Sequence, residues 1–182
     1  MSPTSRILLA LAFPVLAVPA LAQSHPARPA ARPAPVRSAG APKSVGKFED
    51  WQAATHQEGG ALVCYAFTRA SASTPTLPGR GDVVLTVTQR PGSHDAVAIS
   101  AGFAYPAGSE AQLQVEGVQM AFYTANRSAF AREGHAVVAA FEKARSAVVK
   151  SPAPRNASVS DTFSLRGFSP AYAAVNKACS LR

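Results

Sequence analysis

The residue types best able to do chemistry are scattered along this chain. Its four histidines are His25, His56, His94 and His135, and no two stand at a spacing typical of metal ligands. The sequence contains no Gly-x-Ser-x-Gly elbow and no glycine-rich loop that would cradle a phosphate. We therefore expect no metal site and no cofactor, and we interpret the histidines as solvated loop residues.

Two aspartates remain as candidates for acid–base chemistry. Asp95 and Asp161 would act as acid and base only if the fold brought them together, and the sequence shows no proximity. Asp161 precedes Thr162, and such residues commonly order a turn or a strand edge by bonding to the backbone. We therefore expect no catalytic residue and predict that the protein is not an enzyme.

Cys64 and Cys179 are the only cysteines in the chain. They form no Cys-x-x-Cys motif, and neither lies in a basic cluster that would favour a thiolate, so a redox role is not favoured. In an oxidising compartment such a pair predicts one structural disulfide. It would close a loop of about a hundred residues and pin the end of the domain to an early strand.

The first residues predict export from a bacterial cytoplasm. Arg6 precedes an apolar run over residues 7–18, and Ala20-Leu21-Ala22 has the small residues that signal peptidase requires. The run is shorter than the about 20 apolar residues of a spanning helix, and Pro14 and Pro19 interrupt it. We expect a signal peptide over 1–22, cleavage after Ala22, no later transmembrane segment, and a periplasmic or secreted, outer-surface location.

Residues 23–44 are rich in proline and alanine and predict a semi-rigid, disordered linker. Arg28, Arg32, Arg37 and Lys43 have no acidic neighbours there. Together with Arg6 they account for five of the chain's net charge of +8, so the domain itself carries about +3. The linker could contact an anionic surface through these four charges or serve only as a tether, and their wide spacing favours the tether. Nucleic-acid binding is not favoured, because the domain has no basic stripe.

Residues 45–182 have the length of one domain. Alternating apolar and polar side chains predict a hairpin around Gly59-Gly60 and a series of strands. The predicted strands cover residues 48–54, 61–67, 82–88, 96–100, 112–115, 118–123, 146–150 and 158–165.

Two short helices are predicted among these strands. Apolar spacing indicates one over 128–144, most firmly over 135–143, and Ser169 capping Pro170 indicates a second that ends at Cys179. One-sided alternation is typical of antiparallel sheets. The predicted fold is therefore mainly β, an antiparallel β-sandwich with two short helices and one long-range disulfide.

Several blocks of the domain occur in a distinctive order. Phe48-Glu49-Asp50-Trp51, Val63-Cys64-Tyr65-Ala66 and Arg80-Gly81-Asp82 come first, and the longest block, SDTFSLRGFS, covers residues 160–169. In this order they resemble the invasion-associated locus B family of exported bacterial proteins. The family-motif residues are Trp51, Tyr65, Arg80, Gly81, Asp161, Thr162, Ser164, Leu165, Gly167 and Phe168.

The resemblance implies a compact β-sandwich of the bacterial envelope, in a family with some members associated with entry into host cells. It implies no catalytic residue and no cofactor. The chain departs from the family pattern at Phe130, where tryptophan is common, and over residues 153–157, where a small-Arg-Gly-Thr segment is usual.

We therefore expect an exported, non-enzymatic envelope protein that acts in adhesion, host-cell invasion or envelope interaction with an unidentified protein or envelope partner. The alternative is a periplasmic carrier that binds a small ligand between its sheets. An envelope hydrolase is a third, weaker alternative.

Overall fold

The computed structural model describes residues 40–180. The predicted signal peptide, its cleavage site and the linker before residue 40 lie outside the described residues, as do His25, Arg28, Arg32 and Arg37. The first strand begins at Lys43, so the folded region starts two residues before the predicted domain boundary at 45.

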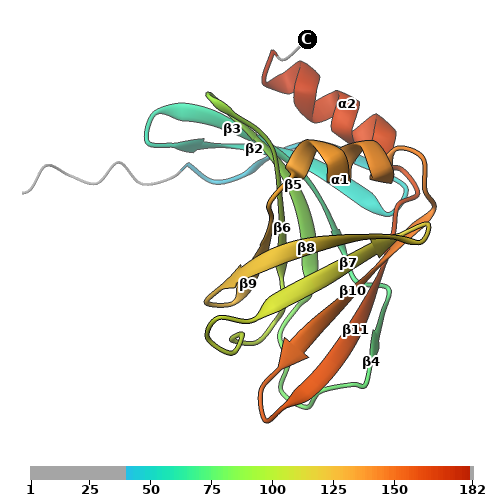
Figure 1. The fold of residues 1–182 in the computed structure, drawn as a ribbon. Helices are drawn as coiled ribbons and strands as arrows, with labels where there is room; N and C mark the ends of the chain where they lie inside the picture. The colour runs from blue at the N-terminus through green and yellow to red at the C-terminus, as the bar shows by residue number, and fades with distance from the viewer. Residues whose placement is uncertain (1–39, 181–182) are drawn as a thin grey trace, which may run out of the picture. The chain divides into compact units, whose positions relative to one another are not determined.

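Within residues 40–180, eleven strands hydrogen-bond into one antiparallel sheet (Figure 1). Their order across the sheet is β1-β2-β3-β5-β6-β9-β8-β7-β10-β11-β4. In chain order the strands are β1 (Lys43–Phe48), β2 (Trp51–Glu58), β3 (Ala61–Arg69), β4 (Ala72–Thr74), β5 (Val84–Arg90), β6 (Ser93–Ser100), β7 (Glu110–Val115), β8 (Val118–Ala125), β9 (Ser128–Ala131), β10 (Ser146–Ala153) and β11 (Ala157–Ser164).

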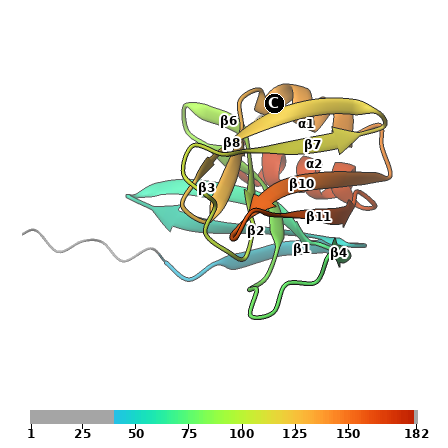
Figure 2. The same ribbon diagram turned by 60° about the horizontal axis from the view of Figure 1, so that its bottom comes forward.

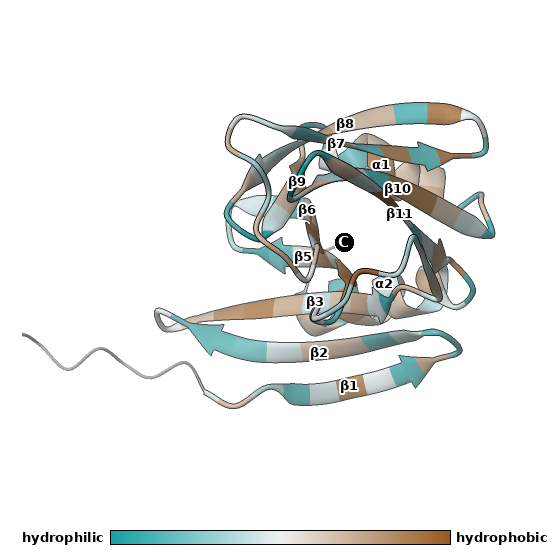
Figure 3. Cartoon of the chain, turned by 90° about the horizontal axis from the view of Figure 1, so that it is seen from below, coloured by the Kyte–Doolittle hydropathy of each residue, from teal (hydrophilic) through white to brown (hydrophobic). Residues whose placement is uncertain are grey.

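The sheet curves until its two halves face each other. β4 follows β3 after two residues in the chain, yet it pairs with β11 at the far edge of the sheet. Ser71, between β3 and β4, donates its backbone N–H to the carbonyl of Thr162 at 2.8 Å. In Figures 2 and 3, β1, β2 and β3 lie opposite β7, β8 and β10, and β5, β6 and β9 join the two layers along one side.

The predicted class, mainly β with two helices and one long-range disulfide, is confirmed. The two separate sheets of a sandwich are not confirmed, because hydrogen bonds run without a break from β1 to β4. The opposed layers of Figure 3 belong to the same sheet.

One face of the sheet is apolar and encloses the core. Cross-strand pairing places Leu85 opposite Ile99 and Val87 opposite Val97, and all four side chains are buried. The opposed layer contributes further buried side chains, namely Leu113, Phe122, Val149 and Phe163. Because side chains alternate along a strand, the residues between these point outward.

Two helices cover one end of this core. α1 (Gly134–Phe141) packs on β6, and α2 (Phe168–Ala178) packs on β1, β2 and β3. Cys179 follows α2 directly and forms the predicted disulfide with Cys64 of β3. In Figure 1 the helices lie at one end of the sheet, and the turn between β10 and β11 lies at the other, which we call the open end.

The predicted helix over 128–144 is wrong in its first part. Ser128–Ala131 forms β9, which pairs with β6 and β8, and the helix occupies only Gly134–Phe141. The apolar spacing that suggested one long helix arises because Phe130 belongs to a strand and only Val137, Val138 and Phe141 to a helix.

The predicted cap of the second helix is also wrong. α2 begins at Phe168 after Gly167, so Ser169 and Pro170 lie in its first turn, where proline is tolerated. Gly167 has a φ of 85°, and a Cβ atom there would lie 2.0 Å from the carbonyl oxygen of Phe48. Glycine is therefore required at this helix start by both conformation and space.

Candidate functional site

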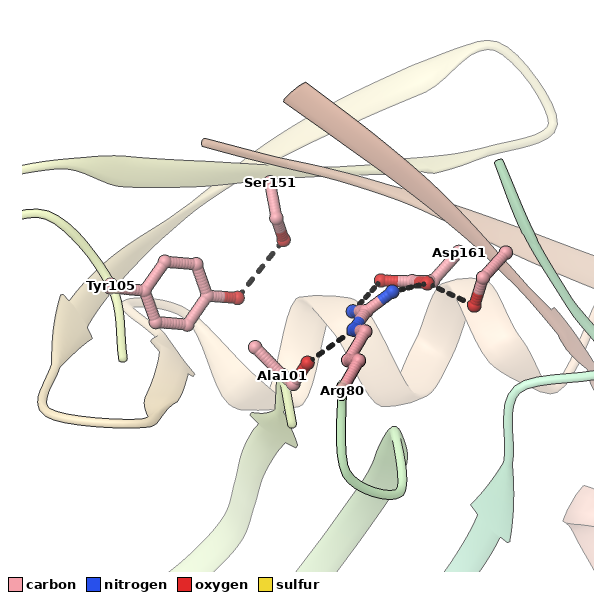
Figure 4. Close-up of polar contacts among 6 residues, drawn as sticks. Arg80, Ala101, Tyr105, Ser151 and Asp161 are labelled. Atoms are coloured by element: carbon pink, nitrogen blue, oxygen red, sulfur yellow. Dashed lines mark hydrogen bonds and ion pairs between the residues drawn. The ribbon is translucent and has the colours of Figure 1, made fainter. Parts of the chain in front are cut away.

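Two family-motif residues far apart in the sequence meet in a buried ion pair. The Nη1 and Nη2 atoms of Arg80 donate to Oδ1 and Oδ2 of Asp161, each at 2.7 Å (Figure 4). The two side chains are only 6% and 1% exposed. The paired fork geometry neutralises both charges inside the protein.

Further contacts fix each partner of this pair. Asp161 projects from β11 and also accepts a hydrogen bond from Ser73 Oγ of β4 at 2.6 Å. Arg80 comes from the segment between β4 and β5, and its Nε donates to the carbonyl of Ala101 at 2.7 Å. Its guanidinium carbon lies 4.9 Å from the centre of the Phe103 ring. The expectation that Asp161 bonds to nearby backbone is wrong, because its partners are side chains brought in by tertiary contacts.

Two glycines let neighbouring segments approach beside the ion pair. The Gly81 N–H donates to the Gly102 carbonyl at 3.1 Å. Gly102 has a φ of 74°, and a Cβ atom there would lie 2.3 Å from the carbonyl oxygen of Gly81. Arg127 Nη2 donates to the same Gly102 carbonyl at 2.8 Å, so this contact gathers three segments at the open end.

A buried phenol lies near the ion pair. The Tyr105 hydroxyl and Ser151 Oγ are 3.0 Å apart, and both residues are buried (Figure 4). Burial, assisted by the negative charge of Asp161, raises the pKa of Tyr105, although the hydrogen bond to Ser151 acts in the opposite direction. The phenol therefore stays neutral near pH 7 and is not suited to act as a base.

A surface pocket of about 410 Å³ lies at the open end, against the exposed side of this cluster. Leu77, Phe103 and Ala157 are among its apolar lining residues. Its charged lining residues are Arg80, Arg127 and Arg155.

A second group of family-motif residues lies near α2, and their contacts stabilise the fold. Trp51 is fully buried, its Nε1 donates to the Ser164 carbonyl at 3.0 Å, and its ring lies edge-on to Phe168 at 4.9 Å. Leu165 is also buried. Thr162 of β11 accepts hydrogen bonds at its carbonyl from the backbone and side chain of Ser71, in the segment between β3 and β4.

Asp95 forms a third cluster, which sequence reasoning did not find. This buried carboxylate accepts hydrogen bonds from Tyr172 at 2.6 Å, Gln89 Nε2 at 2.7 Å and His135 Nδ1 at 3.0 Å. Burial raises the pKa of Asp95, but these hydrogen bonds outweigh it and leave the pKa below its ordinary value. The cluster joins β5 and β6 to both helices, and the structure gives Asp95 and Asp161 separate partners.

The three histidines within residues 40–180 all lie in secondary structure. His56 is in β2, His94 in β6 and His135 in α1, so the expectation that they occupy loops is wrong for all three. His56 is half-buried, with its ring 5.5 Å from that of Tyr65. Within residues 40–180, no three histidine, cysteine or acidic side chains are grouped as metal ligands would be.

Aromatic side chains lie along the outward face of the sheet. Strand pairing aligns one residue from each of five neighbouring strands, from β3 to β8, in a line that we call the outer row: Phe67, Thr86, Ala98, Phe130 and Tyr123. None of these five residues is fully buried.

Both ends of the outer row are aromatic. Tyr123 is 43% exposed and stacks on Phe130 with ring centres 5.4 Å apart. The guanidinium carbon of Arg132 lies 5.6 Å from the centre of the Tyr123 ring. At the opposite end, the family-motif residue Tyr65 lies 5.8 Å from Phe67. Alternation along single strands does not reveal this line, because it depends on the pairing of five strands.

The family model described as invasion associated locus B (IalB) protein matches residues 51–176. The matched span contains all ten family-motif residues, whereas Cys179 lies beyond it. No curated protein and no solved structure matches the chain.

Proposed function

The chain belongs to the invasion associated locus B family, and on that premise we propose that it is a non-enzymatic binding protein of the bacterial envelope. The Cys64–Cys179 disulfide supports an oxidising location such as the periplasm or the outer surface. Neither helix within residues 40–180 combines the length and apolar character needed to cross a membrane. The proposed activity is adhesion to a protein partner, in the envelope or on a host cell.

The observation that carries this proposal is the outer row. Aromatic side chains at its ends flank the small residues Thr86 and Ala98, and Tyr123 is among the few large apolar side chains exposed in the described residues. Tyrosine and phenylalanine are enriched in protein interfaces, where they supply large contact area at low entropic cost. Arg132 beside Tyr123 pairs with Glu110 at 2.7 Å and adds polar groups at the border of this surface.

The buried cluster supports binding over catalysis. Arg80 and Asp161 neutralise each other, and Asp161 already accepts three hydrogen bonds. A general base needs a free lone pair within reach of its substrate. The ion pair of Arg80 and Asp161 therefore stabilises the fold.

A small-ligand carrier is the second candidate, and the pocket at the open end favours it. Its volume of about 410 Å³ is within the range of small-molecule sites. The pocket lies at the end of the sheet, whereas the apolar interior is filled by side chains such as Leu113, Phe122 and Phe163. A carrier would therefore hold its ligand at the surface and not between two layers.

Site-specific photocrosslinking in the producing cell tests the adhesion proposal. A benzoylphenylalanine replaces Tyr123, and we expect one discrete protein adduct. The adduct should disappear when Thr86→Arg places a charge in the middle of the outer row. Ser158→Arg, at an exposed position of β11, is the matched control and should leave the adduct intact. An adduct that survives Thr86→Arg, or none at all from position 123, would contradict the proposal.

A further inference from the structure

We propose that the pocket at the open end binds a small amphipathic anion, with Arg127 and Arg155 receiving its charged group. The ligand class is a carboxylate, sulfonate or phosphate monoester attached to a short apolar body. This inference does not depend on the outer row, which lies on a different surface of the sheet.

The charge balance of the pocket points to an anion. Three arginines line it, and no acidic residue does. Arg80 is neutralised by Asp161 behind it. Among the residues that the structure describes, Arg127 and Arg155 form no ion pair, so the pocket has two uncompensated positive charges.

The position of Arg127 is set by backbone contacts. Its Nη2 donates to the Gly102 carbonyl at 2.8 Å. The same atom lies close to Gly81, 3.7 Å from the position that a Cβ atom would take there. Arginine has five N–H donors in a fixed fork, so this bond orients the guanidinium and leaves further donors free. A guanidinium held in this way loses less entropy when it binds an anion.

The second arginine comes from a separate element. Arg155 lies in the turn between β10 and β11, where the Ala157 N–H approaches the Pro154 carbonyl at 3.4 Å. Arg155 and Asn156 both have positive φ, 60° and 58°, as in the tight hairpin turns that match strand twist. The two arginines therefore reach the pocket from two different turns, Arg127 from the turn between β8 and β9 and Arg155 from the turn between β10 and β11.

The rest of the lining selects for an apolar body. Leu77, Phe103, Ala104 and Ala157 contribute apolar surface, and the pocket volume of about 410 Å³ suits a small molecule. An inorganic ion would leave this surface in water, whereas an amphipathic anion covers it. The combination favours an amphiphile over a free phosphate or sulfate.

Fluorescence titration of the full chain with anilinonaphthalene sulfonate at low salt tests this inference. The uncharged analogue phenylnaphthylamine is the matched probe, because it keeps the aromatic body and lacks the sulfonate. We expect Arg127→Gln/Arg155→Gln to weaken sulfonate binding by roughly a hundredfold, about tenfold for each charged hydrogen-bonding group, and to change phenylnaphthylamine binding less than twofold. Near-UV circular dichroism confirms that the variant is folded.

Lys143→Gln/Arg145→Gln removes the same charge after α1 and should leave both affinities unchanged. Competition separates the ligand classes, since decanoate should displace the sulfonate probe and inorganic phosphate at equal ionic strength should not. Equal loss of sulfonate binding in both double variants would overturn the assignment of Arg127 and Arg155. Displacement by phosphate as effective as by decanoate would overturn the amphiphile. Crosslinking from position 123 reports on the outer row alone, and the titration reports on the pocket alone. Each proposal can therefore fail while the other is still supported by its own experiment.

Discussion

Replacement of Arg80 by methionine should destabilise the fold strongly, because it leaves the Asp161 carboxylate buried without a cation. The Asp161 side chain is 1% exposed and would keep only the hydrogen bond from Ser73. Breaking a buried ion pair by removing one partner typically costs about 3–5 kcal/mol. The Ala101 carbonyl also loses its bond from Arg80, so we expect a loss near the upper end of that range.

The double variant Arg80→Met/Asp161→Leu removes both charges and should be less destabilised than Arg80→Met alone. What remains is the lost partner of the Ala101 carbonyl and of Ser73, about 1–3 kcal/mol for each group that stays buried. Replacing a buried pair by apolar residues of similar volume is often neutral apart from such terms. The two mutations should therefore show a favourable coupling of roughly 1–3 kcal/mol.

Urea unfolding followed by tryptophan fluorescence measures these free energies, because Trp51 is the single tryptophan and is fully buried. The control is Arg69→Met, which breaks an ion pair to Asp82 with side chains 61% and 70% exposed. Exposed pairs contribute about 0–1 kcal/mol. A loss from Arg80→Met no larger than that from Arg69→Met would refute the reasoning, as would a double variant whose loss equals the sum of the singles.

Three further predictions concern other parts of the fold. Cys64→Ala/Cys179→Ala removes the disulfide, which joins residues 115 positions apart, and should lower the free energy of unfolding by about 5 kcal/mol in the chain-entropy model. A reducing agent should cause the same loss of stability in the wild type. The pKa of Asp95 is lowered in the fold, so the ionised Asp95 stabilises the protein above its ordinary pKa of 3.8, and this stabilisation is lost as pH falls through the lower folded pKa. Urea midpoints below pH 4 should therefore fall more steeply for the wild type than for Asp95→Asn. Parallel curves for the two proteins would contradict this. Gly167→Ala should cost about 2–4 kcal/mol from positive φ and the clash with the Phe48 carbonyl, whereas Gly59→Ala, with positive φ and open space, should cost about 1 kcal/mol in the same assay.

Features set by near neighbours were predicted well. The predicted turn at Gly59-Gly60 does form a hairpin, because positive φ at glycine is a local property. The last helix and the disulfide are also confirmed, since one follows from local spacing and the other from there being two cysteines. Helix boundaries were less accurate: β9 has four residues and exists because β6 and β8 pair with it.

The candidate site could be predicted only as a set of residues. The family motif includes Arg80 and Asp161 but does not show that they form an ion pair across 81 positions. Arg127 and Arg155 had no signal beyond being basic residues in turns. Their shared pocket arises from the close approach of Gly81 to Gly102 and from the turn after β10.

The sequence by itself determined that this is a mainly β domain with two helices, one cross-link and the motif of its family. Only the tertiary structure decided that the strands form one curved sheet, that Phe67 and Tyr123 lie in the same outer row, and that two arginines share a pocket. The physical reason is the distance along the chain over which the interactions act. Alternation and turn propensity depend on neighbouring residues. Strand pairing depends on which distant segments gain enough free energy from burying their apolar faces together to offset the entropy of loop closure.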